Sequence, residues 1–235
     1  MQYVRGKDKY IAIGRKRDVK YESADMQLFP RIWDSSNDQF HADFYAEWLD
    51  IGTEKSPITG RDRYKPPTFG QNLNWFFTYQ MSYMYWRYFM WNFAGKQNDI
   101  QGFGNKRDGN WISGISFMDD KRLGKQSMMP DSIAKNDAHN VLFMLPFVLG
   151  ILGCTYQFFR NRKDWVGNFL LFFFTGIAVV LYLNQPGNQP RERDYAYVGS
   201  YYAFALWIGL AVVAFVRLAR DKHDTQRFQT TIIYG

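Results

Sequence analysis

The distribution of apolar residues divides the chain into a polar first part and an apolar last third. Residues 140–159 and 165–183 contain no charged side chain, and a third uncharged stretch covers 195–216. A bilayer core about 30 Å thick requires roughly 20 apolar residues of helix. We therefore predict three transmembrane helices, over 140–159, 165–183 and 201–217. Buried helices of a large soluble protein are the alternative interpretation.

The charges between these segments predict an orientation, because Lys and Arg accumulate in the cytoplasmic loops of membrane proteins. The loop 160–164, "RNRKD", is mostly cationic, and so is the start of the tail after residue 216. The loop 184–200 carries two charges of each sign. We therefore expect the tail, 220–235, in the cytoplasm, and the loop 184–200 and residues 1–138 outside. In a bacterium this describes a multi-pass protein of the inner (cytoplasmic) membrane with a periplasmic segment.

The polar first part contains an unusual aromatic run at 72–95, "NLNWFFTYQMSYMYWRYFMWNFAG", whose only charge is Arg87. Its amide and hydroxyl side chains favour an interfacial helix, or one packed on the bundle, over a fourth span. The next segment, 95–115, is rich in Gly and hydrogen-bonding side chains. Loops of this kind carry ligand-binding residues on many scaffolds, and a plain connector is the other interpretation.

The predicted fold class is therefore mainly α. We expect a polytopic membrane protein in which a transmembrane unit, 139–219, follows a mixed, largely extramembrane segment.

Composition adds limits on partners. The net charge of +7 is compatible with a nucleic-acid partner. Charges of both signs are well mixed in residues 1–138, however, and the remaining excess lies beside the apolar segments, so we expect no nucleic acid. The single Cys154 and three scattered histidines form no disulfide or metal spacing, so we expect no metal among them. The aromatic content of 19% suits membrane interfaces and sugar-binding surfaces.

The segment "RERDYAY" places four consecutive charges between two apolar stretches. The guanidinium groups of Arg191 and Arg193 match phosphate oxygens in pairs, and the phosphates near this surface are lipid headgroups or polyprenyl carriers. The two carboxylates could orient the guanidinium groups or accept a proton, and the two tyrosines could stack on sugar or lipid. A tight turn held by an Arg–Asp network, without a ligand, is equally compatible. The candidate binding residues are Arg191, Glu192, Arg193, Asp194, Tyr195 and Tyr197.

Three segments carry a family resemblance: "RYFMWNFAGKQNDIQG", "GNWISGI" and "LFFFTGIAVVLYLNQPGNQPRERDYAYVGSYYAFALWIGL". They closely resemble bacterial inner-membrane proteins grouped with the protein O-mannosyltransferase-like enzymes, glycosyltransferase family 117. The resemblance runs from about residue 9 to 219. It implies a multispan glycosyltransferase of the GT-C type, which moves a sugar from a polyprenyl-phosphate donor to an external acceptor, often a Ser or Thr hydroxyl.

The same resemblance implies what this chain lacks. Such enzymes use a carboxylate in their first external loop as general base or metal ligand, and nothing here matches that position, so the catalytic residue is unknown. The complete enzyme could hold a divalent cation. Family members have more spans upstream and continue further downstream, so the chain resembles an internal or C-terminal slice. On this frame Arg191 and Arg193 become candidates for holding the donor phosphate, and Asn98 and Asp99 for lining an external cleft.

Two functions follow as expectations. The first is part of a membrane glycosyltransferase whose partners are membrane lipid, a polyprenyl-phosphate sugar donor and an envelope or secreted acceptor protein. The alternative is a non-catalytic, membrane-anchored binding or scaffold protein of the cell envelope. Transport ranks last, because it favours charged or strongly polar residues within the spans, and the apolar stretches offer only Thr155, Gln157, Asn168 and Thr175.

Overall fold

The computed structural model describes residues 2–14, 20–21, 23, 26–33, 38–56 and 59–234, with side chains described for all of these except 132 and 221–234. About 57% of the chain is helical. The helices of the polar part are η2 (Asp38–Phe40), α1 (His41–Leu49), α2 (Phe69–Trp75), η3 (Phe76–Trp86), α3 (Arg87–Phe93), α4 (Ser116–Leu123), η4 (Gln126–Met128) and α5 (Asp131–Ala134). Those of the apolar part are α6 (Leu145–Arg160), α7 (Arg162–Thr175), α8 (Ile177–Leu183), η5 (Asp194–Tyr197) and α9 (Val198–Tyr234).

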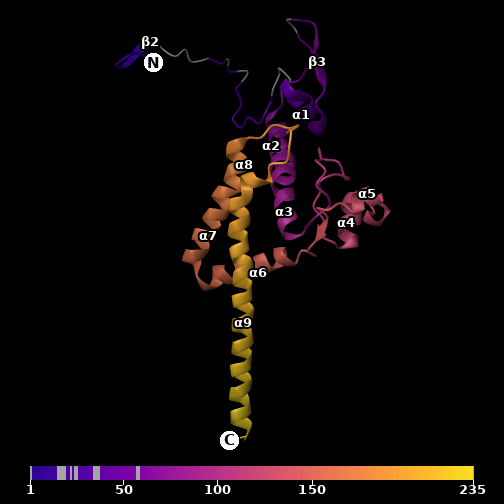
Figure 1. Cartoon of the computed structure of the whole chain (residues 1–235), viewed down its shortest axis with the longest axis vertical. Helices are drawn as coiled ribbons and strands as arrows, with labels where there is room; N and C mark the ends of the chain where they lie inside the picture. Colours follow the sequence, from indigo (N-terminus) through magenta and orange to yellow (C-terminus); the bar gives the residue numbers. More distant parts are fainter. Residues whose placement is uncertain are drawn as a thin grey trace.

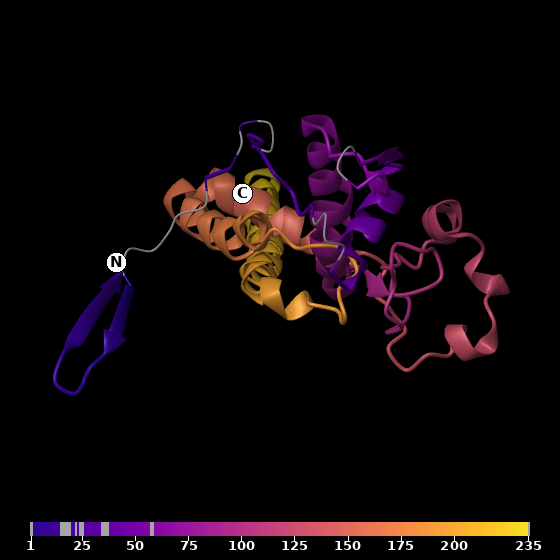
Figure 2. The same ribbon diagram turned by 90° about the horizontal axis from the view of Figure 1, so that it is seen from above.

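Three small antiparallel pairs complete the secondary structure of the described residues. The strands are β1 (Gln2–Arg5), β2 (Tyr10–Gly14), β3 (Thr53–Lys55), β4 (Asp62–Tyr64), β5 (Gly95–Lys96) and β6 (Asn140–Val141), paired β1–β2, β3–β4 and β5–β6. The pair β5–β6 joins the two ends of the segment 95–141. That segment, which carries α4 and α5, lies to one side of the other helices (Figures 1 and 2).

The predicted helix at 72–95 is present as α2, η3 and α3, which run without a break over residues 69–93 and are called here the aromatic helix. It begins with a capping box, in which Thr68 and Gln71 each satisfy a backbone N–H of the other. Its middle third, η3, is a π-helix. It ends before Gly95, whose φ of 148° and close approach to Asn140 O, 2.6 Å from an added Cβ, admit only glycine.

Among the described residues, two helical segments are long and apolar enough to cross a membrane: Arg162–Leu183, made of α7 and α8, and Asp194–Arg220, made of η5 and most of α9. They contain the predicted spans 165–183 and 201–217. Only 11% and 22% of their apolar windows are buried within the chain. Apolar helices with so much uncovered surface require lipid or a partner around them.

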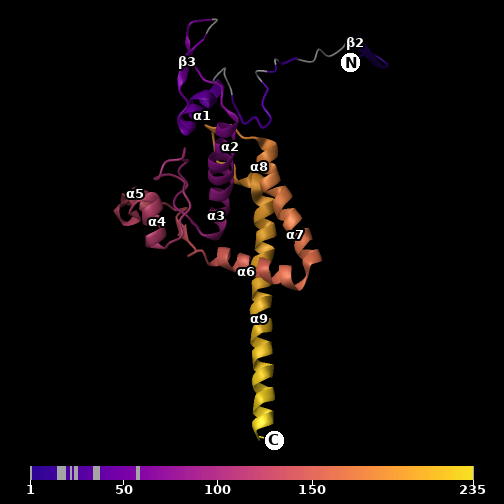
Figure 3. The ribbon, with the colours of Figure 1, turned by 180° about the vertical axis from the view of Figure 1, so that it is seen from behind.

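The predicted span 140–159 differs in the structure. Residues 140 and 141 pair as β6, and Phe143 and Met144 take positive φ angles of 52° and 56°, so helix α6 begins only at Leu145. At 1.5 Å per residue, its 16 residues rise about 24 Å, which is short of the 30 Å core. Helix α6 crosses α9 (Figures 1 and 3).

Glycines allow α6 and α9 to approach closely. A Cβ added at Gly153 would lie 1.7 Å from the carbonyl oxygen of Trp207, and one at Gly150 would lie 2.2 Å from the ring of Phe204. The indole Nε1 of Trp207 donates a hydrogen bond to Gln157 Oε1 at 2.7 Å. These contacts place α6 against the part of α9 that is its candidate membrane span.

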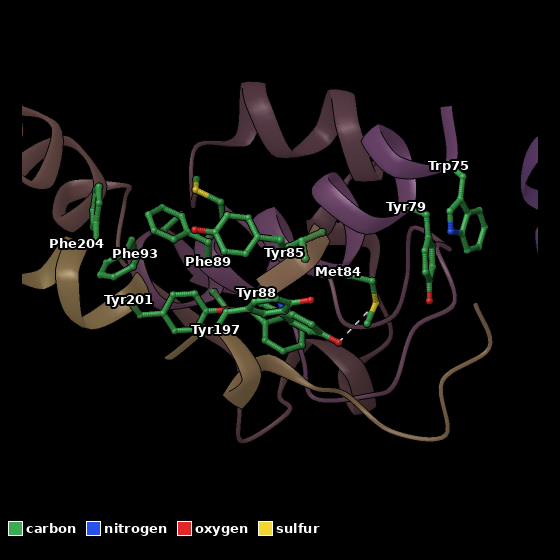
Figure 4. Packing of buried hydrophobic residues seen from close by; sticks show 14 of the residues in the cluster. Trp75, Tyr79, Met84, Tyr85, Tyr88, Phe89, Phe93, Tyr197, Tyr201 and Phe204 are labelled. Atoms are coloured by element: carbon green, nitrogen blue, oxygen red, sulfur yellow. Dashed lines mark hydrogen bonds between the residues drawn. The ribbon is translucent and has the colours of Figure 1, made fainter. Parts of the chain in front are cut away.

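The hydrophobic core lies where the aromatic helix meets α6, α7 and α9 (Figure 4). Phe89 is at its centre, with ring centroids 4.8 Å from Phe93, 4.8 Å from Phe204 and 6.1 Å from Tyr201. Edge-to-face and tilted rings of this kind stabilise more than their buried area alone. The aromatic helix therefore packs against the other helices, which is one of the two arrangements expected for residues 72–95.

Candidate functional site

The segment between α8 and α9, residues 184–197, is called here the charged loop, and it lies along the aromatic helix. Gln80 Nε2 donates to Asn184 Oδ1 at 3.1 Å and to Gln185 O at 2.9 Å. The hydroxyl of Tyr79 donates to Pro186 O at 3.4 Å. Because these donors belong to the π-helical segment η3, one helix fixes the path of a loop that is about 100 residues away in sequence.

An ion pair between buried Arg87 and partly exposed Glu192 joins the same helix to the centre of the charged loop. Arg87 is 3% exposed, and its Nη2 and Nη1 donate to Glu192 Oε2 at 2.8 Å and Oε1 at 3.2 Å. The hydroxyl of Tyr88 also donates to Glu192 Oε2. Arg87 further donates from Nη1 to Gly109 O at 2.6 Å and from Nε to Tyr83 O at 3.0 Å. Almost every donor of this guanidinium therefore has an acceptor.

The surroundings of Arg87 keep it charged. Burial disfavours the charged form of Arg87, but the hydrogen bonds to Glu192 and the neighbouring charges outweigh it, so the pKa of Arg87 is raised above its ordinary value. Burial also raises the pKa of Tyr83 and that of Tyr88, so both phenols stay neutral and able to donate. A cation in an otherwise uncharged aromatic helix is stable only because its carboxylate partner is present.

Rings stack in a row that leads to this pair. Trp75 and Tyr79 have ring centroids 4.2 Å apart with planes 21° apart, and Tyr79 and Tyr83 follow at 5.6 Å and 23° (Figure 4 shows the first two). The guanidinium carbon of Arg87 then lies 4.1 Å from the centre of the Tyr83 ring. Four-residue spacing along one helix face produces this stack, and the last contact is a cation–π interaction.

The two arginines predicted to bind phosphate are placed differently from each other. Arg191 is exposed and, with Glu192, borders a recess of about 10 Å³, which is room for about one water molecule. Arg193 is half-buried, and its Nε is buried without a hydrogen-bond partner among the described residues. Within the described part of the chain, neither forms an ion pair with Glu192 or Asp194. The carboxylate of Glu192 orients Arg87 instead.

The remaining predicted residues of the loop separate into surface and core. Tyr195 is 58% exposed, whereas Tyr197 is 1% exposed and packs edge-to-face on Tyr85 at 5.3 Å. The hydroxyl of Tyr197 donates to Gln185 Oε1 at 3.3 Å. Asp194 begins η5. Of the two tyrosines, only Tyr195 is available to a ligand, and Tyr197 holds the two ends of the loop together.

Asn98 and Asp99 are adjacent in sequence but differ in environment. Asn98 is fully buried; its Nδ2 donates to Arg107 O at 2.9 Å, and its Oδ1 accepts from Gly109 N at 2.8 Å. Asp99 is exposed and accepts from Asn136 Nδ2 at 2.8 Å. Asn98 therefore shapes the loop from within, and Asp99 ties its surface to the segment after α5.

Arg87 also lines a second and larger recess, of about 230 Å³, which we call the indole recess. The sequence did not identify it, because its walls come from four separate segments. Its lining residues are Trp48, Thr78, Ser82, Tyr83, Arg87, Gly104, Asn110, Trp111 and Arg122. Among all the described residues, no group of three or more His, Cys, Asp and Glu side chains is arranged to hold a metal ion.

One sequence signal pointed to the ion pair. Arg87 is the only charge in a run of aromatic and polar residues, and a buried cation requires a carboxylate. The four-charge segment offered Glu192 and Asp194, but the choice between them depends on the packing of the loop.

Comparison with known proteins adds a family of unknown function (DUF8416), whose model matches residues 1–77. That range includes α1, α2 and Trp75 and ends before Arg87 and the charged loop. No curated protein and no solved structure matches the chain.

Proposed function

We propose that the chain is part of a membrane glycosyltransferase that takes a sugar from a polyprenyl-phosphate-type lipid donor and passes it to an external acceptor, such as a protein Ser or Thr hydroxyl. Two candidate membrane helices and the resemblance to the O-mannosyltransferase-like family support the proposal. The observation that carries it is the Arg87–Glu192 pair, which leaves the charged loop with unmatched positive charge at the end of both helices.

The ion pair changes the charge balance of the loop. Arg191, Glu192, Arg193 and Asp194 sum to zero in the sequence. Because Arg87 neutralises Glu192, the charges left for a ligand are two cations and one anion. The guanidinium groups of exposed Arg191 and half-buried Arg193 then offer charge-assisted hydrogen bonds to a phosphate.

The position of the loop fits a lipid ligand. It connects the end of α8 to the start of α9, so it lies at one end of both candidate spans. In a membrane protein that position is close to the lipid headgroups. With the orientation expected from the loop charges, this end faces the periplasm of a bacterial inner membrane, where an envelope or secreted acceptor protein is accessible.

The test is the double variant Arg191→Ala/Arg193→Ala, made in the complete protein of the source organism. We expect its affinity for polyprenyl phosphate in lipid nanodiscs to fall at least tenfold, because each charge-assisted hydrogen bond contributes about 1.5 to 3 kcal/mol. We also expect it to lose transfer of labelled mannose from polyprenyl-phosphate mannose to envelope proteins. The matched control is Arg160→Ala/Lys163→Ala, which removes two exposed cations from the junction of α6 and α7, at the other end of the candidate membrane helix.

Unchanged binding and transfer in the Arg191/Arg193 variant would overturn the phosphate role of the loop. If the complete protein transfers no sugar and its deletion leaves envelope glycosylation unchanged, the non-catalytic scaffold function replaces the enzyme.

A further inference from the structure

The indole recess combines the two kinds of surface that a sugar ring requires. Trp48, Tyr83 and Trp111 contribute aromatic rings, and the polar lining comes from hydroxyl, amide and guanidinium groups. The C–H groups on one face of a pyranose pack on aromatic rings, while its hydroxyls form hydrogen bonds at the rim. The volume of about 230 Å³ is below the usual 300 to 1,000 Å³ range of sites for drug-sized ligands, so it suits a single ring.

The walls of the recess are held in place before any ligand arrives. Trp48 donates from Nε1 to Thr78 Oγ1 at 2.9 Å, and its ring lies 5.6 Å from that of Tyr83. Gly104 has a φ of 93°, and a Cβ there would lie 2.4 Å from the Trp48 ring, so only glycine leaves the indole in this position.

The opposite wall is equally fixed. The guanidinium carbon of Arg122 lies 3.9 Å from the centre of the Trp111 ring, and its Nη2 donates to Trp111 O. Asn110 donates from Nδ2 to Gln97 Oε1 at 3.1 Å and to Asn105 O at 3.0 Å. The side chains that line the recess are therefore preorganised, which reduces the entropy lost on binding.

The charges around the recess favour a neutral ligand over an anion. Arg87 is paired with Glu192 at 2.8 Å, and the nearest carboxylate oxygen of Asp119 lies 3.7 Å from Arg122 Nη2. Each cation that lines the recess is thus matched by a carboxylate behind it. The two guanidinium groups therefore present hydrogen-bond donors to the recess while their positive charges are neutralised. Such donors suit the hydroxyl oxygens of a neutral ligand.

We infer that the indole recess is a binding site for a neutral pyranose ring, separate from the phosphate-binding loop. Ser82 and Asn110 contribute polar groups to its lining, and the rings of Trp48, Tyr83 and Trp111 contribute its aromatic surface. This site does not depend on the proposed transferase activity, because a scaffold protein that recognises envelope carbohydrate would use it equally.

The experiment is a titration of tryptophan fluorescence with the purified chain in lipid nanodiscs, since sugar-based detergents would compete. The probes are the methyl glycosides of mannose, glucose and galactose, N-acetylglucosamine, and inorganic phosphate as the anionic comparison. We expect saturable binding of at least one neutral glycoside in the millimolar range, as is usual for a single small ring, and weaker or no binding of phosphate.

Two pairs of variants separate the recess from general effects. Ser82→Leu fills the recess from an exposed helical position and is expected to lower affinity at least tenfold, whereas Ser82→Ala changes it less than threefold. Trp111→Leu is expected to abolish binding, and Trp165→Phe, on α7 away from the recess, leaves it unchanged. Circular dichroism confirms that each variant is folded.

The proposal is overturned if glycosides bind Ser82→Leu as tightly as the original chain, or if phosphate binds the recess more tightly than every glycoside. The Arg191→Ala/Arg193→Ala variant keeps the two functions distinguishable. It is expected to lose polyprenyl phosphate and retain the glycoside.

Discussion

Arg87 and Glu192 are 105 residues apart in sequence, and their side chains meet through two hydrogen bonds, with Nη2–Oε2 at 2.8 Å and Nη1–Oε1 at 3.2 Å. This pair ties the aromatic helix to the loop between the two candidate membrane helices. It also lies between the two sites proposed here, because Glu192 belongs to the charged loop and Arg87 lines the indole recess.

Removing the acidic partner should destabilise the protein strongly. Glu192→Ala leaves Arg87 buried without a carboxylate, and breaking a buried pair in this way costs about 3 to 5 kcal/mol. The control is Glu54→Ala, which removes the pair with Arg63, whose side chains are 36% and 50% exposed and which is worth about 0.5 kcal/mol. Chemical denaturation of the two variants in lipid nanodiscs measures the loss of unfolding free energy in each. Equal losses in the two variants would show that Arg87 finds another partner.

The contact of α6 with α9 should not tolerate a side chain at Gly153. Because an added Cβ would lie 1.7 Å from a backbone oxygen of α9, Gly153→Ala must move one helix, at a cost of about 1 to 3 kcal/mol. Gly209 is also helical but has nothing within 4 Å of such a Cβ, so Gly209→Ala should be neutral or stabilising by up to about 1 kcal/mol. Thermal unfolding of the two variants compares them directly, and similar midpoints would contradict this helix packing.

The two ends of the first candidate membrane helix, Arg162–Leu183, should lie on opposite sides of the membrane. In a Cys154→Ser background, which removes the single cysteine, we introduce Pro190→Cys or Lys163→Cys, both at exposed positions. A membrane-impermeant maleimide added to intact cells should label position 190, and position 163 only after permeabilisation. Labelling of both positions in intact cells would exclude two membrane crossings.

The loop 97–110 should lose stability in acid. Hydrogen bonds from Arg107 hold the pKa of Asp108 below its ordinary value of 3.8, although burial acts in the opposite direction. A lowered folded-state pKa stabilises the protein fully above the unfolded value, and this contribution is lost as the pH falls through the folded value. Asp108→Asn should therefore be less stable than the original chain at pH 7, with a difference that shrinks below pH 3.8. A difference that stays constant from pH 7 to pH 2 would assign the effect to shape alone.

The long helices were predictable because their signals are local. The aromatic run at 72–95 contains neither Gly nor Pro before its last residue, and the structure makes it helical over residues 69–93. The spans expected at 165–183 and 201–217 lie within the two candidate membrane helices. The span expected at 140–159 begins late, because the pairing of Asn140 with Lys96 is a contact with a distant segment that hydropathy does not register.

The candidate site was only partly predictable. The sequence identified the four charges of the loop and named Arg191 and Arg193 together as candidates for binding phosphate. It did not show that Glu192 forms an ion pair with Arg87, that Tyr197 is a core residue, or that Asn98 is enclosed by its own loop. The indole recess was not foreseen at all, because Trp48, Ser82, Trp111 and Arg122 are brought together only by folding.

The sequence by itself determined where the chain is apolar, where it is helical and which segment carries concentrated charge, since these properties depend on residues within a few turns of one another. Only the tertiary structure decided how that charge is distributed. A carboxylate acts as part of a ligand site or as the partner of a buried cation according to its neighbours in space, and for Glu192 that neighbour lies 105 residues away.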